Sequence, residues 1–264
     1  MRLAIAFAGA MAMASALAGC AGNFDGAGLS PGSTAGQQAA LPRGSCVGVV
    51  SAIGHSFTVK TIGLMVFGNE EKEVAIDSWG IENLMVSRVA AHVGPQVKVK
   101  RIAYPKEPLN SPRRPGLFSD NEGPLKARLQ ALSPSERCAR YVAISRYEYE
   151  FTGTNQTVGG LGIVRRPSLI THSTFALHAM FALTLYEGPN LTRLRHRVAP
   201  SGEGPWMGVV RGPHVGIETA NWPDPPEAAA RSPRLRQATS ELVSQSMDRT
   251  LANLRVLEGN QSGM

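Results

Sequence analysis

The residues from Thr174 to Tyr186 alternate so regularly that they predict one long β-strand. One face of this strand carries large apolar side chains, Phe175, Leu177, Phe181, Leu183 and Leu185, and the other carries His178, Met180 and Thr184. Because strand side chains point to alternate faces, a one-residue slip would turn the apolar face away from the core. The chain must therefore build a sheet whose register is set by the burial of this face.

Strand-like and helix-like segments alternate around this strand. Further strands are predicted at 47–53, 56–67, 96–104, 141–151 and 158–164, and helices at 81–93, 125–132 and 233–257. Ser232 and Pro233 have the residue types of an N-cap and a first helical position. The last helix has one broad apolar face, from Leu242 to Leu257, with which it should pack on the sheet. This order predicts an α/β or α+β fold with a mixed sheet of about five to six strands, packed helices and a C-terminal amphipathic helix.

The first 19 residues have the features of a secretory signal. Arg2 precedes an apolar run over 3–14, followed by small residues. The run is short for crossing a bilayer core of about 30 Å, which argues against the alternative of a membrane helix. Leu17-Ala18-Gly19-Cys20 resembles the bacterial lipobox, which implies that the sulfur of Cys20 is acylated and that Cys20 becomes the N-terminus. Ala21, in place of an aspartate, implies sorting to the periplasmic face of the outer membrane.

Composition divides the rest of the chain. Residues 20–45 hold the lipidated cysteine and a flexible tether, because Gly, Ala, Ser and Gln dominate there. Residues 46–258 are expected to form a single α/β domain, in which 187–233 is a long irregular segment rich in proline and glycine, and 259–264 a disordered tail. The hydrophobic content of 43% is ordinary for a globular chain.

The formal net charge of +7 would favour nucleic acid in an intracellular protein. Export removes that partner, so we expect no binding of nucleic acid. A membrane partner through the N-terminal lipid is expected instead, together with an envelope protein or an anionic envelope polymer. The basic residues are spread out, and a solvated surface explains them better than a dedicated anionic partner does.

Two cysteines remain once Cys20 is acylated. Cys46 precedes the first predicted strand and Cys138 precedes the strand near Tyr141. Exported cysteines tend to pair, and two parallel strands would bring both sulfurs to the same sheet edge. We therefore predict a disulfide between Cys46 and Cys138, with two buried free thiols as the alternative.

The order of elements resembles a group of bacterial envelope proteins: the curli secretion-channel lipoproteins, the penicillin-binding-protein activator lipoproteins and the N-terminal domain of the Tol-Pal translocation protein. The resemblance rests on 47–67, the helix after Ser78, the strands from Gln96 and Tyr141, and the hairpin that ends at Tyr186. Two short stretches, 67–70 (Phe-Gly-Asn-Glu) and 77–81 (Asp-Ser-Trp-Gly-Ile), also resemble uncharacterised proteobacterial outer-membrane lipoproteins. These likenesses imply a fold but no chemistry.

Catalytic motifs are weak. Ser56 follows His55 at the end of a predicted strand and could be a hydrolase nucleophile, but adjacent strand side chains point to opposite faces and Gly-x-Ser-x-Gly is absent. His172 and His178 are about 20 Å apart on one strand and cannot share a metal ion. Gly159-Gly160-Leu161-Gly162 lacks the strand–helix context of a phosphate loop, so hairpin glycines explain it better. We therefore expect no cofactor, no metal site and no catalytic residue.

Two tryptophans in the irregular segment, Trp206 and Trp222, are candidates for a partner surface, or else fasten the segment to the domain. The function predicted from the sequence is a membrane-anchored periplasmic lipoprotein that acts without catalysis in envelope assembly or maintenance. The alternatives are an envelope serine hydrolase that uses Ser56 and a protein that binds a small anionic ligand.

Overall fold

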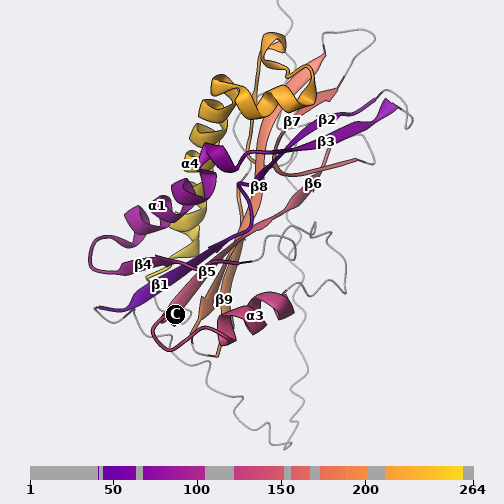
Figure 1. Ribbon diagram of the computed structural model, residues 1–264. Helices are drawn as coiled ribbons and strands as arrows, with labels where there is room; N and C mark the ends of the chain where they lie inside the picture. The colour runs from indigo at the N-terminus through magenta and orange to yellow at the C-terminus, as the bar shows by residue number, and fades with distance from the viewer. Residues whose placement is uncertain are drawn as a thin grey trace, which may run out of the picture. The chain divides into compact units, whose positions relative to one another are not determined.

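The structure is a computed structural model (Figure 1). It describes residues 41, 44–63, 68–104, 122–151, 156–166, 173–188, 190–200 and 212–257. The chain divides into two units, residues 1–36 and 37–264, and every described residue belongs to the second. No helix in these ranges has both the length and the apolar character needed to cross a membrane.

The described strands are β1 Cys46–Ser51, β2 Ser56–Thr61, β3 Glu70–Ala75, β4 Lys98–Arg101, β5 Arg140–Arg146, β6 Glu148–Glu150, β7 Thr157–Arg166, β8 Thr174–Glu187, β9 Thr192–Val198 and β10 His214–Gly216. The α-helices are α1 Ile81–Val93, α3 Glu122–Gln130 and α4 Pro233–Leu254. Short 3-10 helices are η2 Asp77–Trp79, η3 Thr219–Asn221 and η4 Pro226–Arg231.

Strand β8 is the predicted long strand, and both halves of the sheet share it. Its first half pairs with β7 and β10, and its second half with β5 and β9, all antiparallel. Ala179 and Phe181 make backbone hydrogen bonds toward β10 and β9, whereas Met180 accepts one from Tyr147 after β5. Alternate residues of a strand bond to opposite edges, so β5 and β7 follow one another along the same edge of β8.

Each half of the sheet is completed by a strand pair on its outer side. Strand β1 runs parallel to β5 and also to β4, which gives one half the order β9-β8-β5-β1-β4. Strand β2 runs parallel to β7 and antiparallel to β3, which gives the other half the order β10-β8-β7-β2-β3. Strand β6, which follows β5, pairs antiparallel with residues 157–159 at the beginning of β7 and forms a hairpin with them. We call this the β6–β7 hairpin.

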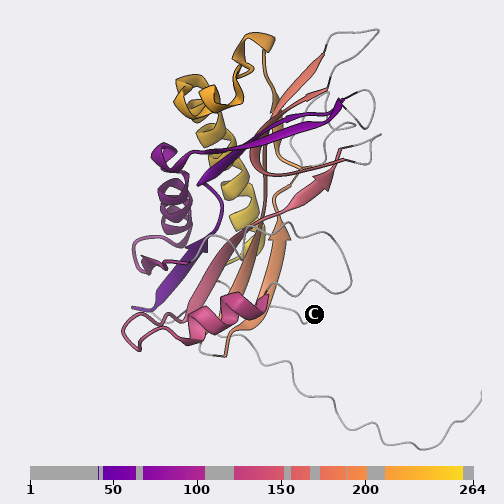
Figure 2. The same cartoon turned by 45° about the vertical axis from the view of Figure 1, so that its right-hand side comes forward.

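Helices α1 and α4 cover one face of the sheet (Figures 1 and 2). Leu177, Phe181, Leu183 and Leu185 of the predicted apolar face of β8 are buried in the core on this face, where β8 contacts α4, and α1 in turn packs against α4 and β1. Helix α4 begins as predicted, because the Ser232 hydroxyl accepts a hydrogen bond from the Leu235 amide and Pro233 is the first helical residue. The largest core therefore forms between these two helices and the sheet.

The C-terminal end of α4 is fastened to the sheet by two arginines. Arg195 on β9 donates to the carbonyl oxygens of Leu254 and Arg255, and the buried guanidinium of Arg140 on β5 donates to Val256. The last carbonyls of a helix have no partners within it and carry partial negative charge, so cations are favourable there. Burial lowers the pKa of Arg140 from its ordinary value.

The opposite face of the sheet has two separate covers. Helix α3 packs Leu125 and Leu129 against Tyr141 and Tyr186 in the β5–β1 half. The β6–β7 hairpin places Phe151 and Val158 over Ala176 and Met180 in the β7–β2 half. Helix α3 fills its half with apolar side chains, whereas the hairpin encloses many polar ones.

Three expectations change. The sheet has ten strands in the described residues, more than the predicted five to six. On each edge of β8, two strands pair with its successive halves, β7 and β5 on one edge and β10 and β9 on the other, and short strands are added elsewhere. Strand β3 was missed because its sequence, Glu-Glu-Lys-Glu-Val-Ala, is mostly exposed at a sheet edge and has no apolar alternation. Part of the segment 187–233, expected to be irregular, forms β9, β10, η3 and η4. Pairing with β8 explains β9 and β10, which the proline and glycine content of the segment does not predict.

Candidate functional site

A polar cavity of about 700 Å³ lies between the sheet and the β6–β7 hairpin. Side chains from β2, β3, β5, β6, β7 and β8 line it, and some of them come from positions more than a hundred residues apart in the chain. Helices α1 and α4 lie on the other face of the sheet, so the cavity is separate from the main core.

Two glycines of β7 allow neighbouring groups to approach closely beside this cavity. Gly162 pairs with Thr58 on one side and with His178 on the other. A Cβ on Gly162 would lie 2.5 Å from the Thr58 carbonyl oxygen and 2.8 Å from Nε2 of His178. A Cβ on Gly159 would lie 2.6 Å from the Glu148 side chain. The stretch 159–162 is thus strand backbone with two close approaches, in keeping with the hairpin interpretation of its glycines.

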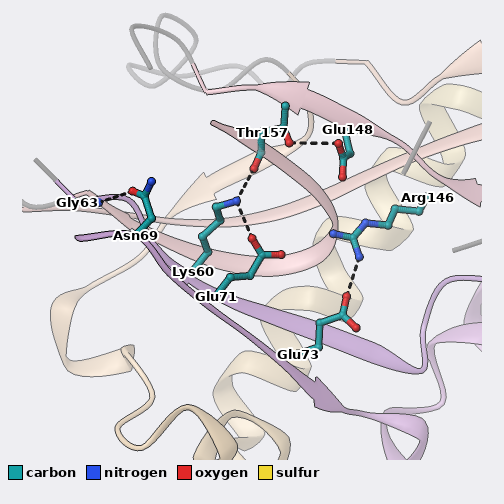
Figure 3. A network of polar contacts seen from close by, with 8 residues as sticks. All are labelled: Lys60, Gly63, Asn69, Glu71, Glu73, Arg146, Glu148 and Thr157. Carbon is teal, nitrogen blue, oxygen red and sulfur yellow. Dashed lines mark hydrogen bonds and ion pairs between the residues drawn. The ribbon is translucent and has the colours of Figure 1, made fainter. Parts of the chain in front are cut away.

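Two ion pairs join the cavity wall to edge strand β3 (Figure 3). Lys60 on β2 is only 8% exposed; its Nζ lies 2.7 Å from Oε2 of Glu71 and donates to the Thr157 carbonyl at 2.9 Å. Arg146, at the end of β5, places Nη1 2.8 Å from Oε1 of Glu73. Both cations of the cavity are therefore neutralised by carboxylates of β3.

The hairpin adds two further carboxylates. Glu148 and Glu150 alternate along β6 and both line the cavity, where the Thr157 hydroxyl donates to Glu148 at 3.1 Å. No described lysine or arginine forms an ion pair with either of them. The cavity therefore has an excess of negative charge, although the whole chain has a net charge of +7.

His178 is the least exposed polar side chain at this site, at 1%. Its Nδ1 lies 3.3 Å from the Gly160 carbonyl oxygen, and because a carbonyl can only accept, Nδ1 carries the proton. Nε2 then has a free lone pair, and it has no hydrogen-bond partner among the described atoms. Burial lowers the pKa of His178 to about 3, so the ring is neutral at physiological pH. His178 is thus a buried acceptor at the cavity.

Arg146 supplies the complementary group. Its Nε is also buried and has no partner within the described part of the chain, while its Nη1 is held by Glu73. The arrangement can therefore offer acceptors from Glu148, Glu150 and His178 and one donor from Arg146. This set suits binding of a small polar molecule.

The predicted disulfide is present. Cys46 and Cys138 are bonded; Cys46 is the first residue of β1, Cys138 lies just before β5, and these two strands are parallel neighbours. Cys20 and Trp206 lie outside the described residues. Trp222 is half-buried: its ring packs on Phe175 with centroids 5.8 Å apart, and the Arg165 guanidinium lies 4.9 Å from its centroid. These contacts fasten Trp222 to the sheet, and a role in partner binding stays a prediction.

The hydrolase and metal candidates gain no support from geometry. Ser56 lies on β2 opposite Ala75, and among the described residues its Oγ forms no hydrogen bond with a histidine. In the same part of the chain, no three His, Cys, Asp or Glu side chains come together in a way that could hold a metal ion. The sequence did place His178 on the less apolar face of its strand, but Lys60, Glu71, Arg146 and Glu148 were missed. Their polar alternation was visible, yet only the strand order brings them together.

No family model matches the sequence, and a search of curated proteins found no match. Among solved structures, protein XCC0632 from Xanthomonas campestris, of family DUF330, is similar over 81% of this chain and 89% of its own, with a TM-score of 0.36 and 11% identity. A neuraminyllactose-binding hemagglutinin homolog from Helicobacter pylori is similar over 83% of this chain and 84% of its own, with a TM-score of 0.34 and 8% identity. Both likenesses are distant.

Proposed function

We propose that this chain is a lipid-anchored protein of the periplasmic face of the outer membrane, which acts in envelope assembly or maintenance by binding and not by catalysis. The observation that carries the proposal is the disulfide between Cys46 and Cys138. Structural disulfides form in oxidising compartments, which agrees with the export signal and the lipobox-like Leu17–Cys20.

The position of the bridge also suits an anchored protein. Residues 21–45 separate Cys20 from Cys46, and the bridge joins the beginning of β1 to the segment just before β5. A pull on the lipid would then reach β1 and β5 together, so the first strand would not peel from the sheet. The cavity under the β6–β7 hairpin is the site that we assign to binding, and the exposed surfaces would meet an envelope protein or polymer.

The anchor is tested by fractionating cells that express the full chain or its Cys20→Ala variant. We expect the unaltered chain in the outer-membrane fraction, and the variant either in the soluble periplasm or unprocessed. A Cys46→Ser, Cys138→Ser double variant is the control, because it lacks both other cysteines and should stay on the membrane. Membrane retention of a processed Cys20→Ala protein would exclude the lipid anchor.

The non-catalytic role is tested with a fluorophosphonate probe on the purified full chain. We expect no labelling of Ser56 and an unchanged biological phenotype for Ser56→Ala. Labelling that disappears on this substitution would favour the serine hydrolase instead.

A further inference from the structure

We propose that the cavity under the β6–β7 hairpin binds a small organic cation, an aliphatic ammonium compound that also carries a hydroxyl group or a second amine. This inference rests on the binding role proposed above and names the chemical class of the ligand.

Charge is the first reason. Lys60 and Arg146 are each paired with a carboxylate of β3, Glu71 and Glu73. Glu148 and Glu150 then remain on β6 without an ion-pair partner among the described residues. A ligand with positive charge would neutralise this excess, whereas Glu148 and Glu150 would repel an anion, and Nζ of Lys60 and Nη1 of Arg146 are already paired with carboxylates.

Hydrogen-bonding capacity is the second and independent reason. His178 is 1% exposed, lines the cavity, and keeps an Nε2 lone pair without a partner in the described structure. A buried acceptor of this kind is normally satisfied, and here only a molecule in the cavity that donates a hydrogen bond can do so. Because Glu148 and Glu150 are also acceptors, the cavity is matched by a molecule with several donors.

The buried Nε donor of Arg146 indicates a second polar group that the ligand should carry. Nε of Arg146 is buried and without a partner among the described atoms, so it can donate to a ligand oxygen or a neutral amine nitrogen. An ammonium group on the carboxylates and a hydroxyl between His178 and Arg146 would satisfy both sides, because a hydroxyl donates and accepts. Amino alcohols and amino sugars have this combination, and about 700 Å³ is enough room for one of them.

Isothermal titration of the purified full chain in a neutral detergent tests the proposal. The probes are glucosamine and ethanolamine, with N-acetylglucosamine as the matched compound that lacks the charge, and inorganic phosphate as the anion. We expect saturable binding of the two amines that weakens as salt is added, and none of the other two probes.

Substitutions of the hairpin carboxylates test where the amine binds. Glu148→Gln and Glu150→Gln keep the side-chain shape and remove the charge, and each should weaken amine binding about tenfold, the loss typical of a charge-assisted hydrogen bond. Glu241→Gln on α4 is the matched control, because α4 lies on the other face of the sheet, and should change nothing. Nitrogen NMR of His178 should show a proton on Nδ1 and a shift of Nε2 when glucosamine is added.

Several results would overturn the proposal. They are equal binding of N-acetylglucosamine and glucosamine, binding of phosphate alone, no binding of either amine, or amine binding that both glutamine variants leave intact. The fractionation and labelling experiments test the lipid anchor and the absence of catalysis separately from ligand binding. A negative titration would therefore exclude the proposed ligand class without excluding the anchored, non-catalytic role.

Discussion

His178 on β8 lies directly opposite Gly162 on β7, and the imidazole occupies the space in which a side chain at Gly162 would stand. The missing side chain of one strand is thus what lets the neighbouring strand place a buried acceptor at the cavity. The close approach of Gly162 and His178 therefore affects both the stability of the fold at this site and the hydrogen bonds that the site can form.

Gly162→Ala should destabilise the protein by about 1–3 kcal/mol, because the new Cβ would lie 2.5 Å from a backbone oxygen that cannot move without disturbing β2. Gly123→Ala in α3 is the control, since a Cβ there meets nothing within 4 Å apart from its chain neighbours, so that its cost is limited to the crowding by the following Pro124. Urea denaturation of both variants measures the difference. Equal stabilities would mean that the close approach at Gly162 is not present.

Acid should destabilise the protein through His178. Its pKa is lowered from 6.5 to about 3 in the folded chain, so the unfolded chain takes up a proton first as the pH falls below 6.5. Stability is then lost on acidification down to about pH 3, by about 2 kcal/mol between pH 7 and pH 5. Urea titrations at these two pH values should show this loss in the unaltered chain and its absence in His178→Gln. The same loss in both proteins would assign it to other groups.

Reduction of the Cys46–Cys138 bridge should lower the free energy of unfolding by about 4–5 kcal/mol, because the bridge closes a loop with a sequence separation of 92. Denaturation with and without a reductant measures the effect, and the Cys46→Ser, Cys138→Ser double variant should not respond to the reductant. Thiol counting on the unfolded, non-reduced protein adds a direct check. Two reactive thiols there would contradict the bridge.

Glu71→Gln should cost about 1–2 kcal/mol, because it leaves the largely buried ammonium of Lys60 without its carboxylate. Lys72→Gln, on the next residue of β3, removes a pair with Glu227 in which both side chains are more than half exposed, and should produce no measurable change. Thermal unfolding of the two variants compares them. A larger loss for Lys72→Gln would reverse our ranking of the two pairs.

Sequence patterns were sufficient to predict the elements in which buried and exposed side chains follow a regular period. The alternation of Thr174–Tyr186 correctly predicts β8 and its buried face, and the N-cap at Ser232 correctly predicts the beginning of α4. The positions of Cys46 and Cys138 predict their bridge, because they lie at the beginning of β1 and just before β5, two strands that prove to be parallel neighbours. In each case, the signal is local or depends on one simple geometric assumption.

The cavity could not be predicted in this way. Lys60, Glu71, Arg146, Glu148 and His178 belong to five different strands, and each alone is an ordinary polar residue of a strand. Strand β3 has no apolar alternation, so the two carboxylates that neutralise Lys60 and Arg146 had no expected place.

The sequence by itself determined the long strand, the helices that cover it, the cysteine pair and the expectation of export, because burial periodicity and cysteine usage are properties of the chain. Only the tertiary structure decided that β5 and β7 share one edge of β8 and that β6 and the beginning of β7 form a hairpin over the sheet. The physical reason is that strand order depends on contacts between distant segments, and that order brings His178, Gly162 and the hairpin carboxylates to one cavity.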